Sequence, residues 1–131
     1  SSKPLQFEPG TEMKYSNSNY MLLGYIIEKI TKESYESFVD NTIFKPLSMK
    51  HSGFDFTGLF SADKAVGYFN INPNSYSKAP GVHSTVSYSA GAMYSNIEDL
   101  LKWHLALLND KIMDAKSKQK AFAPYKNNFA V

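Results

Sequence analysis

The pattern of apolar positions predicts three main helices, of which the first begins near the N-terminus. Residues 20–27, Tyr-Met-Leu-Leu-Gly-Tyr-Ile-Ile, are apolar around the whole helical circumference, which is typical of a helix buried on most sides. Asn17 or Ser18 can cap the start of this helix, after a turn and a brief extended segment. Gly24 costs about 1 kcal/mol of helix propensity relative to alanine. We therefore expect another element to pack closely on the helix at Gly24.

The second predicted helix starts at Ser34, which is a favourable N-cap residue. Its apolar side chains recur at helical spacing and form one stripe: Tyr35, Phe38, Val39 and Ile43. Pro46 ends the helix, because the residue before a proline is pushed out of the helical region of backbone conformation. The chain then turns, so that Met49 can fold back onto the helices.

The third predicted helix carries the clearest start signal, because Ser95 and Glu98 have the spacing of a capping box. A broad apolar face follows at helical spacing: Ile97, Leu100, Leu101, Leu105 and Leu108. The pair at 109–110, Asn-Asp, ends this helix. A short, weak helix is predicted over 114–122, and it stops near Pro124.

Between these helices, residues 52–89 lose all periodicity and are rich in Gly, Pro, Asn and Ser. This segment predicts a loop with one short strand or hairpin around 65–71. So long an irregular stretch is unusual in a compact domain, and it is either a functional rim or a region that depends on a missing partner. The end of the chain, 127–131, begins like a strand and then stops. The pattern as a whole predicts a mostly α fold with short β segments, in which residues 1–131 form one helical subdomain excised from a larger domain.

Composition narrows the possible functions. The chain has 131 residues, which fits one domain. All fourteen of its basic residues are lysine, so bidentate guanidinium contacts to guanine or phosphate are unavailable and sequence-specific nucleic-acid binding is not expected. The chain has no cysteine, which removes disulfides and thiolate chemistry and leaves the compartment open. His51, His83 and His104 share no metal-ligand spacing, so we expect neither a metal nor another cofactor.

A resemblance to a known family rests on Tyr15-Ser16-Asn17 and its surroundings. This triplet resembles the Tyr-x-Asn motif of serine β-lactamases, penicillin-binding proteins and related esterases, in the class C-like branch. The triplet alone is not specific, because Tyr94-Ser95-Asn96 is a second copy. The flanking segments also resemble that family in order and spacing: Pro9-Gly10-Thr11, Leu22-Leu23-Gly24, Pro46-Leu47-Ser48-Met49 and Ala90-Gly91-Ala92-Met93-Tyr94-Ser95.

The resemblance implies a fold and two site residues. The chain would be the helical part of the α/β serine β-lactamase and DD-peptidase-like fold, and its parent would be a serine hydrolase. Tyr15 would relay a proton between the catalytic serine and the leaving group, and Asn17 would contact the amide side chain of the substrate. A phenol is a poor base at neutral pH unless adjacent ammonium groups stabilise its anion, and the family's lysines belong to motifs outside this chain. The competing interpretation is a helix-entry cap beside a half-buried aromatic ring.

The family's other two motifs are not convincingly present. Ser-x-x-Lys occurs at Ser61/Lys64, Ser75/Lys78 and Ser117/Lys120. We reject these matches, because a chain rich in serine and lysine produces some by chance and because all of them follow Tyr-x-Asn, whereas the family's nucleophile precedes it. His51-Ser52-Gly53 matches the third motif, His-x-Gly, but directly follows a segment where the family has a structural turn. We therefore expect no nucleophile in this chain.

The sequence thus predicts a fragment that supplies one wall of an active site and is inactive alone. The substrate of the intact parent would be a β-lactam, a D-amino-acid peptide or an ester, and its compartment the bacterial cell envelope or the secreted fraction. The alternative is a β-lactamase-like binding or interaction module without catalysis. Since the helices should pack on a sheet that the chain lacks, we also expect exposed apolar surface and with it a homodimer or domain exchange.

Overall fold

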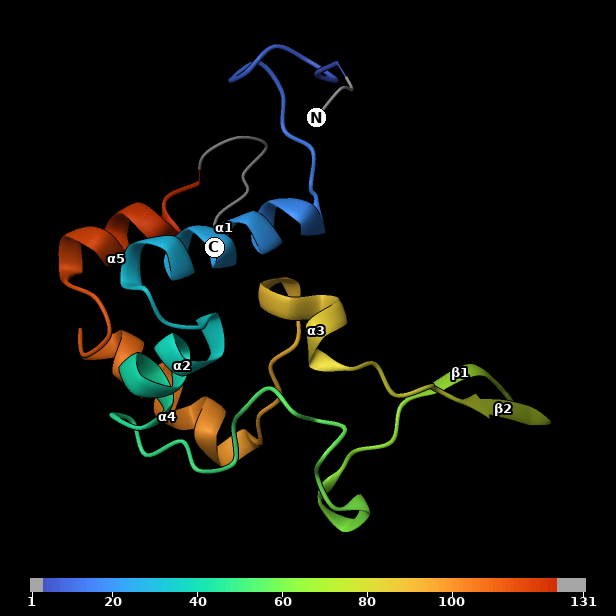
Figure 1. Ribbon diagram of the computed structural model, residues 1–131. Helices are drawn as coiled ribbons and strands as arrows, with labels where there is room; N and C mark the ends of the chain where they lie inside the picture. Colours follow the sequence, from blue (N-terminus) through green and yellow to red (C-terminus); the bar gives the residue numbers. More distant parts are fainter. Residues whose placement is uncertain (1–3, 125–131) are drawn as a thin grey trace.

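The structure is a computed structural model that describes residues 4–124, and it is built mainly from helices (Figure 1). In chain order its helical elements are α1 (Asn17–Thr31), α2 (Tyr35–Val39), the π-helical turn η1 (Asp40–Phe44), the 3₁₀ turn η2 (Ser61–Asp63), α3 (Ser84–Ser87), the 3₁₀ turn η3 (Tyr88–Ala90), α4 (Ile97–Leu108) and α5 (Ala115–Phe122). A two-stranded antiparallel hairpin, β1 (Tyr68–Asn72) and β2 (Ser75–Lys78), projects away from the helices. The mostly α fold with short β segments is therefore confirmed.

The first helix begins one or two residues before the predicted start, depending on which of the two predicted caps is taken. Its N-cap is Ser16, which has an extended backbone and makes no capping hydrogen bond with its side chain. The prediction that Asn17 or Ser18 caps the helix is wrong, because Asn17 is already helical and its side chain accepts a hydrogen bond from Tyr15. At the other end Lys32 adopts a left-handed conformation, and its N–H donates to the carbonyl of Glu28, which closes the last turn.

The predicted burial of α1 is only partly correct. Gly24 is the one residue of the helix that is buried, and η3 packs against it as the sequence predicted. The prediction that the helix is buried on most sides is wrong for the described residues. Most of its large apolar side chains are exposed: Leu22, Leu23, Tyr25, Ile26 and Ile30. The physical reason is that no element within residues 4–124 covers this face.

The core lies between α2, η1 and the segment that follows them. Ser34 caps α2 as predicted, with its hydroxyl accepting from the N–H of Ser37. The chain turns at Pro46, and Met49 folds back and donates its N–H to the carbonyl of Phe44. The buried side chains form one cluster: Val39, Phe44, Met49 and Phe54. Partly buried aromatic and aliphatic side chains, among them Trp103 of α4, pack against this cluster.

The fourth helix starts at a different cap from the predicted one. Its N-cap is Asn96, whose side-chain oxygen accepts from the N–H of Asp99. The predicted capping box of Ser95 and Glu98 is wrong, because the Ser95 hydroxyl is directed to Ser52 instead. The predicted end at Asn109 is confirmed. The apolar face of α4 is largely exposed, like that of α1.

Residues 52–89 contain more structure than their composition indicates. The strands lie a few residues after the predicted hairpin position, with Tyr68 opposite Lys78 and Phe69 opposite Ser77. The side chain of Asn72 accepts from two N–H groups of the connecting turn, which holds the hairpin closed. The turns η2 and α3 were not predicted. The predicted last helix is confirmed as α5, with Asp114 as its N-cap, whereas the strand-like segment 127–131 lies outside the described residues.

Candidate active-site wall

The two residues singled out from the sequence lie together at the start of α1. The Tyr15 hydroxyl donates to the Asn17 side-chain oxygen over 3.0 Å. The Tyr15 ring is 60% exposed, and it leans on the ring of Tyr20, with 5.6 Å between centroids. Since the amide oxygen of Asn17 is engaged, its amide nitrogen can donate to a carbonyl oxygen of a ligand. The pair is thus an exposed phenol beside an oriented amide.

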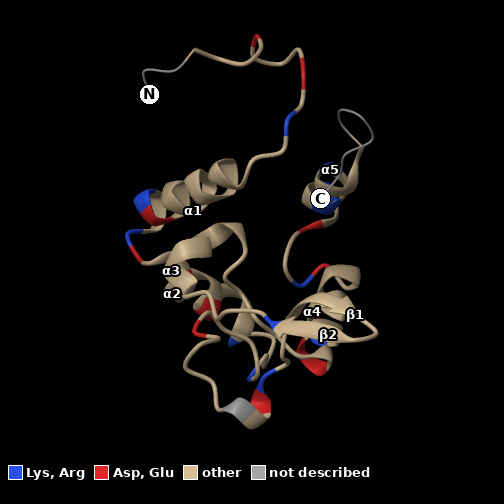
Figure 2. Cartoon of the chain, turned by 90° about the vertical axis from the view of Figure 1, so that its right-hand side faces the viewer, with Lys and Arg blue, Asp and Glu red and all other residues tan. Residues whose placement is uncertain are grey.

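The electrostatic setting of this pair is simple. The first turns of α1 carry no charged side chain, and Glu28 and Lys29 lie towards the far end of the helix (Figure 2). The unpaired N–H groups and the positive dipole end of α1 therefore face the entrance without a neutralising carboxylate on the helix itself. An electron-rich group of a ligand is favoured there.

The second copy of the triplet has a different environment. The backbone of Tyr94 pairs with Gly53 through two hydrogen bonds, and its ring contacts Phe56 at 6.2 Å between centroids. The side-chain oxygen of Asn96 is used as the cap of α4. The side-chain oxygen of Asn17 accepts from the phenol of Tyr15. The corresponding oxygen of Asn96 accepts from a backbone N–H instead. This copy stabilises the fold.

A buried carboxylate holds the second copy in place. Asp99 is fully buried and accepts from the N–H of His51 at 2.7 Å, the Ser52 hydroxyl at 3.0 Å and the Lys102 ammonium at 2.6 Å. Burial alone would raise the pKa of Asp99, but these three donors outweigh it and lower the pKa below its usual value. The His51-Ser52-Gly53 run is thereby tied to the packing of α4, which agrees with its interpretation as a structural turn.

The rejected Ser-x-x-Lys matches that can be described lie in ordinary surroundings. Ser75 begins β2, and its hydroxyl accepts from the side chain of Asn72. Ser117 lies in the first turn of α5, where its N–H donates to Asp114. Within residues 4–124 no hydrogen bond joins Ser75 to Lys78 or Ser117 to Lys120. Lys64 donates to the carbonyl of Thr57.

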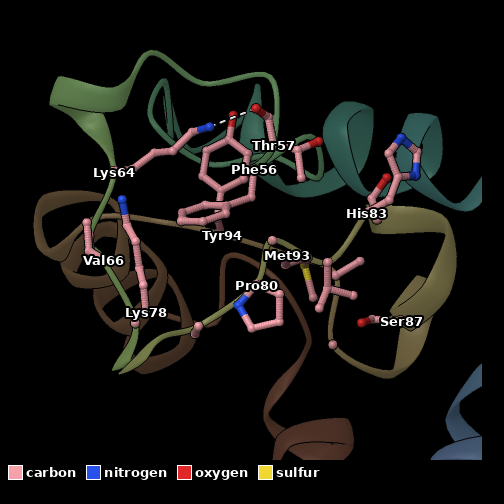
Figure 3. A pocket seen from close by; sticks show the side chains of 18 residues that line it. Phe56, Thr57, Lys64, Val66, Lys78, Pro80, His83, Ser87, Met93 and Tyr94 are labelled. Atoms are coloured by element: carbon pink, nitrogen blue, oxygen red, sulfur yellow. Dashed lines mark hydrogen bonds between the residues drawn. The ribbon is translucent and has the colours of Figure 1, made fainter. Parts of the chain in front are cut away.

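A large pocket within the described residues lies away from Tyr15 and Asn17. Its volume is about 760 Å³, and it is formed by loops on both sides of the hairpin together with the segment before α4. Lys64 and Lys78 lie at one end of it and His83 and Ser87 at the other, with Phe56 and Tyr94 on its wall (Figure 3). The pocket therefore combines aromatic and aliphatic walls with two ammonium groups.

The structural roles of three residues in this architecture were not predicted from the sequence. Asp99 had a weak signal, because it lies three residues after a favourable cap residue, Asn96. Tyr88 and Ser89, which pack on Gly24, had no sequence signal of their own. The sequence predicted only that another element packs on the helix at Gly24. Their contacts join positions that are far apart in sequence.

Two negative findings apply to the described part of the chain. No helix within residues 4–124 is long and apolar enough to cross a bilayer. In the same range no group of three histidine or acidic side chains is arranged to hold a metal ion.

With this geometry established, comparison with known proteins identifies the family. Residues 1–130 match the family model described as Beta-lactamase, and the chain therefore belongs to this family. Its structure is the helical portion of the β-lactamase and DD-peptidase fold.

Individual relatives support this assignment. PbpX of Bacillus subtilis strain 168, which bears a penicillin-binding protein name, is 36% identical over 118 residues, covering 89% of this chain and 29% of PbpX. The D-amino acid amidase of Ochrobactrum anthropi SV3, solved with D-phenylalanine, has a TM-score of 0.80 and 27% identity, covering 95% of this chain and 40% of the amidase. An octameric penicillin-binding protein homologue from Pyrococcus abyssi has a TM-score of 0.77 and 28% identity, covering 89% of this chain and 26% of the homologue. The chain thus spans well under half the length of these relatives.

Proposed function

We propose that the chain forms one wall of the active site of a serine hydrolase, with Tyr15 as proton relay and Asn17 as substrate contact. The observation that carries this proposal is the hydrogen bond between the two side chains at an exposed helix entrance. Membership of the β-lactamase family supports acyl transfer as the reaction class. The phenol moves the proton of the nucleophile, and the amide holds the carbonyl group beside the reacting bond.

The nucleophile and the third motif belong to residues outside 1–131. In this proposal residues 1–131 are one helical subdomain, a fragment of a larger β-lactamase-like domain. A phenol becomes an effective base only where nearby ammonium groups stabilise its anion. The chain alone therefore lacks both the attacking serine and the base, and it is inactive.

The substrate class is a β-lactam, a D-amino-acid peptide or amide, or an ester. All of them present a carbonyl group to a serine, so one constellation serves them all. The family and the D-amino acid amidase among the solved neighbours support this range.

The test compares the 131-residue chain with a longer reading frame that contains it. We expect the chain to hydrolyse neither nitrocefin, nor D-phenylalanine p-nitroanilide, nor p-nitrophenyl acetate, and to form no adduct with benzylpenicillin by intact mass. The longer protein should hydrolyse at least one of these substrates. A stoichiometric adduct on Ser61, Ser75 or Ser117 of the short chain would overturn the proposal, and so would a longer protein without activity on all three.

A non-catalytic binding module is the second candidate function. The observation that favours it is the pocket of about 760 Å³ with Lys64 and Lys78 at one end, which lies apart from Tyr15. Aromatic walls with two ammonium groups suit an anion that carries an apolar group. A longer reading frame without an upstream Ser-x-x-Lys would favour the module.

The exposed apolar faces of α1 and α4 support self-association as a further part of the proposal. Large contiguous apolar surfaces are rare on monomers. A relative that is described as octameric shows that oligomers occur among similar structures. We expect a homodimer or domain exchange of the 131-residue chain in sedimentation velocity, and a monomer at high concentration would contradict it.

A further inference from the structure

A close contact joins α1 to the turn η3. A Cβ atom added at Gly24 would lie 2.5 Å from the Ser89 Cβ and 3.0 Å from the Tyr88 Cε1. The first separation is one that real Cβ atoms essentially never show, and the second is tighter than most carbon contacts, so a side chain at position 24 would push the turn away from the helix.

Backbone strain marks the same place. Tyr88 has φ 44° and ψ −133°, which a residue with a side chain rarely adopts. Such a conformation costs about 1–3 kcal/mol and persists only where the surroundings enforce it. The ring of Tyr88 is held against that of Tyr35, with 5.5 Å between centroids, and its carbonyl accepts from the N–H of Ala92. The strained residue therefore fixes the direction in which Ser89 leaves the turn.

Ser89 uses that direction to reach α1. Its hydroxyl donates to the carbonyl of Tyr20 over 2.7 Å, across 69 positions of sequence. Tyr20 lies in the first turn of α1, and its ring supports the ring of Tyr15. Tyr15 in turn donates to Asn17. An unbroken series of contacts thus leads from Ser89 to the two residues of the site wall.

We propose that Ser89 is a positioning residue, whose hydrogen bond to Tyr20 holds the first turn of α1 so that Tyr15 stays beside Asn17. This inference rests on the proposed function of Tyr15 and Asn17. Ser89 touches neither substrate nor nucleophile, and it acts through Tyr20. A phenol that must meet a proton within hydrogen-bond range loses rate when its ring can turn away, whereas substrate binding loses only the contribution of Asn17, which lies in the same turn. Loss of the hydroxyl therefore lowers kcat by a larger factor than it raises KM.

The first measurement uses the 131-residue chain and needs no activity. In Ser89→Ala we expect the nuclear Overhauser contacts between the rings of Tyr15 and Tyr20 to weaken severalfold, while the amide spectrum of α4 stays unchanged. The matched control is Ser37→Ala, which also removes a hydroxyl that makes a partly buried hydrogen bond, here to Glu33 in a different part of the fold. Ring contacts that persist unchanged in Ser89→Ala would overturn the inference.

The second measurement uses the longer protein. Ser89→Ala should lower kcat about tenfold with a smaller change in KM, and Ser37→Ala should change kcat less than twofold. If ring contacts are lost but kcat is unchanged, Ser89 does not position the site and the inference is wrong. If the unaltered longer protein has no activity, the proposed function fails, and the ring contacts alone then decide whether Ser89 orients Tyr15.

Discussion

The chain contains Tyr-Ser-Asn twice, and the two copies have different structural environments. At 15–17 the tyrosine is exposed, and its hydroxyl meets the side chain of Asn17. At 94–96 the tyrosine pairs its backbone with Gly53, and Asn96 caps α4. The same three residues are available for a ligand in one place and engaged in the fold in the other.

The difference is produced by what surrounds each copy. A fully buried carboxylate, Asp99, lies three residues beyond the second copy and ties it to His51 and Ser52. The first copy has no such anchor, and its Ser16 caps α1 without using its side chain. An exposed phenol beside an oriented amide suits chemistry, whereas a tripeptide whose backbone pairs with a neighbouring segment and whose asparagine caps a helix suits stability. Four experiments can break or sharpen this contrast.

The largest effect is expected at the first copy. In the longer protein Tyr15→Phe should lower kcat/KM by about 100-fold or more, the usual contribution of a positioned proton-transfer group. The matched control is Tyr25→Phe, which removes an exposed hydroxyl further along the same helix. Initial rates with the best reporter substrate measure both. A loss of kcat/KM of less than about fivefold in Tyr15→Phe would contradict a catalytic role of the first copy.

The next effect concerns the anchor of the second copy. Asp99→Asn should destabilise the chain by about 2–3 kcal/mol, because it removes the charge that pairs with Lys102 and weakens two buried hydrogen bonds. Glu98→Gln, one position earlier and exposed, should change stability by less than about 0.5 kcal/mol. Urea denaturation followed by circular dichroism gives both values. Equal effects of the two variants would argue against a special role of Asp99.

A smaller effect separates the two asparagines directly. Asn96→Ala removes the cap of α4 and should cost about 1 kcal/mol of unfolding free energy. Asn17→Ala should cost less than about 0.5 kcal/mol, since its partner is an exposed phenol. The same denaturation experiment compares them. If Asn17→Ala proves the more destabilising variant, the first copy is a structural cap as well.

The fourth experiment follows the dependence of stability on pH. The pKa of Asp99 is lowered in the folded chain, so its charge stabilises the fold above its ordinary pKa of about 4, and this stabilisation is lost as the pH falls through the lower, folded value. The urea midpoints of the unaltered chain and of Asp99→Asn should therefore converge as the pH falls below about 4. Midpoints that stay a constant distance apart over this range would contradict the lowered pKa.

Local signals in the sequence were reliable where a helix start or end depends on neighbouring residues. Ser34, Pro46 and the end of α4 at Asn109 were predicted from their local chemistry. The cap of α4 was predicted one residue too early, because Ser95 is as good a cap residue as Asn96 and its hydroxyl is used by a distant serine, Ser52. The predicted burial of α1 failed for a related reason, since periodicity reports that a face is apolar and not what covers it.

The sequence by itself determined the family, the helical character of the chain and the pair of residues expected to act, because these depend on short motifs and local periodicity. Only the tertiary structure decided which tripeptide keeps its side-chain groups available, that Asp99 is buried and that Ser89 reaches α1. These facts rest on contacts that span about half the chain, such as the 69 positions between Ser89 and Tyr20. No local pattern contains them, since they arise only when the helices and turns pack.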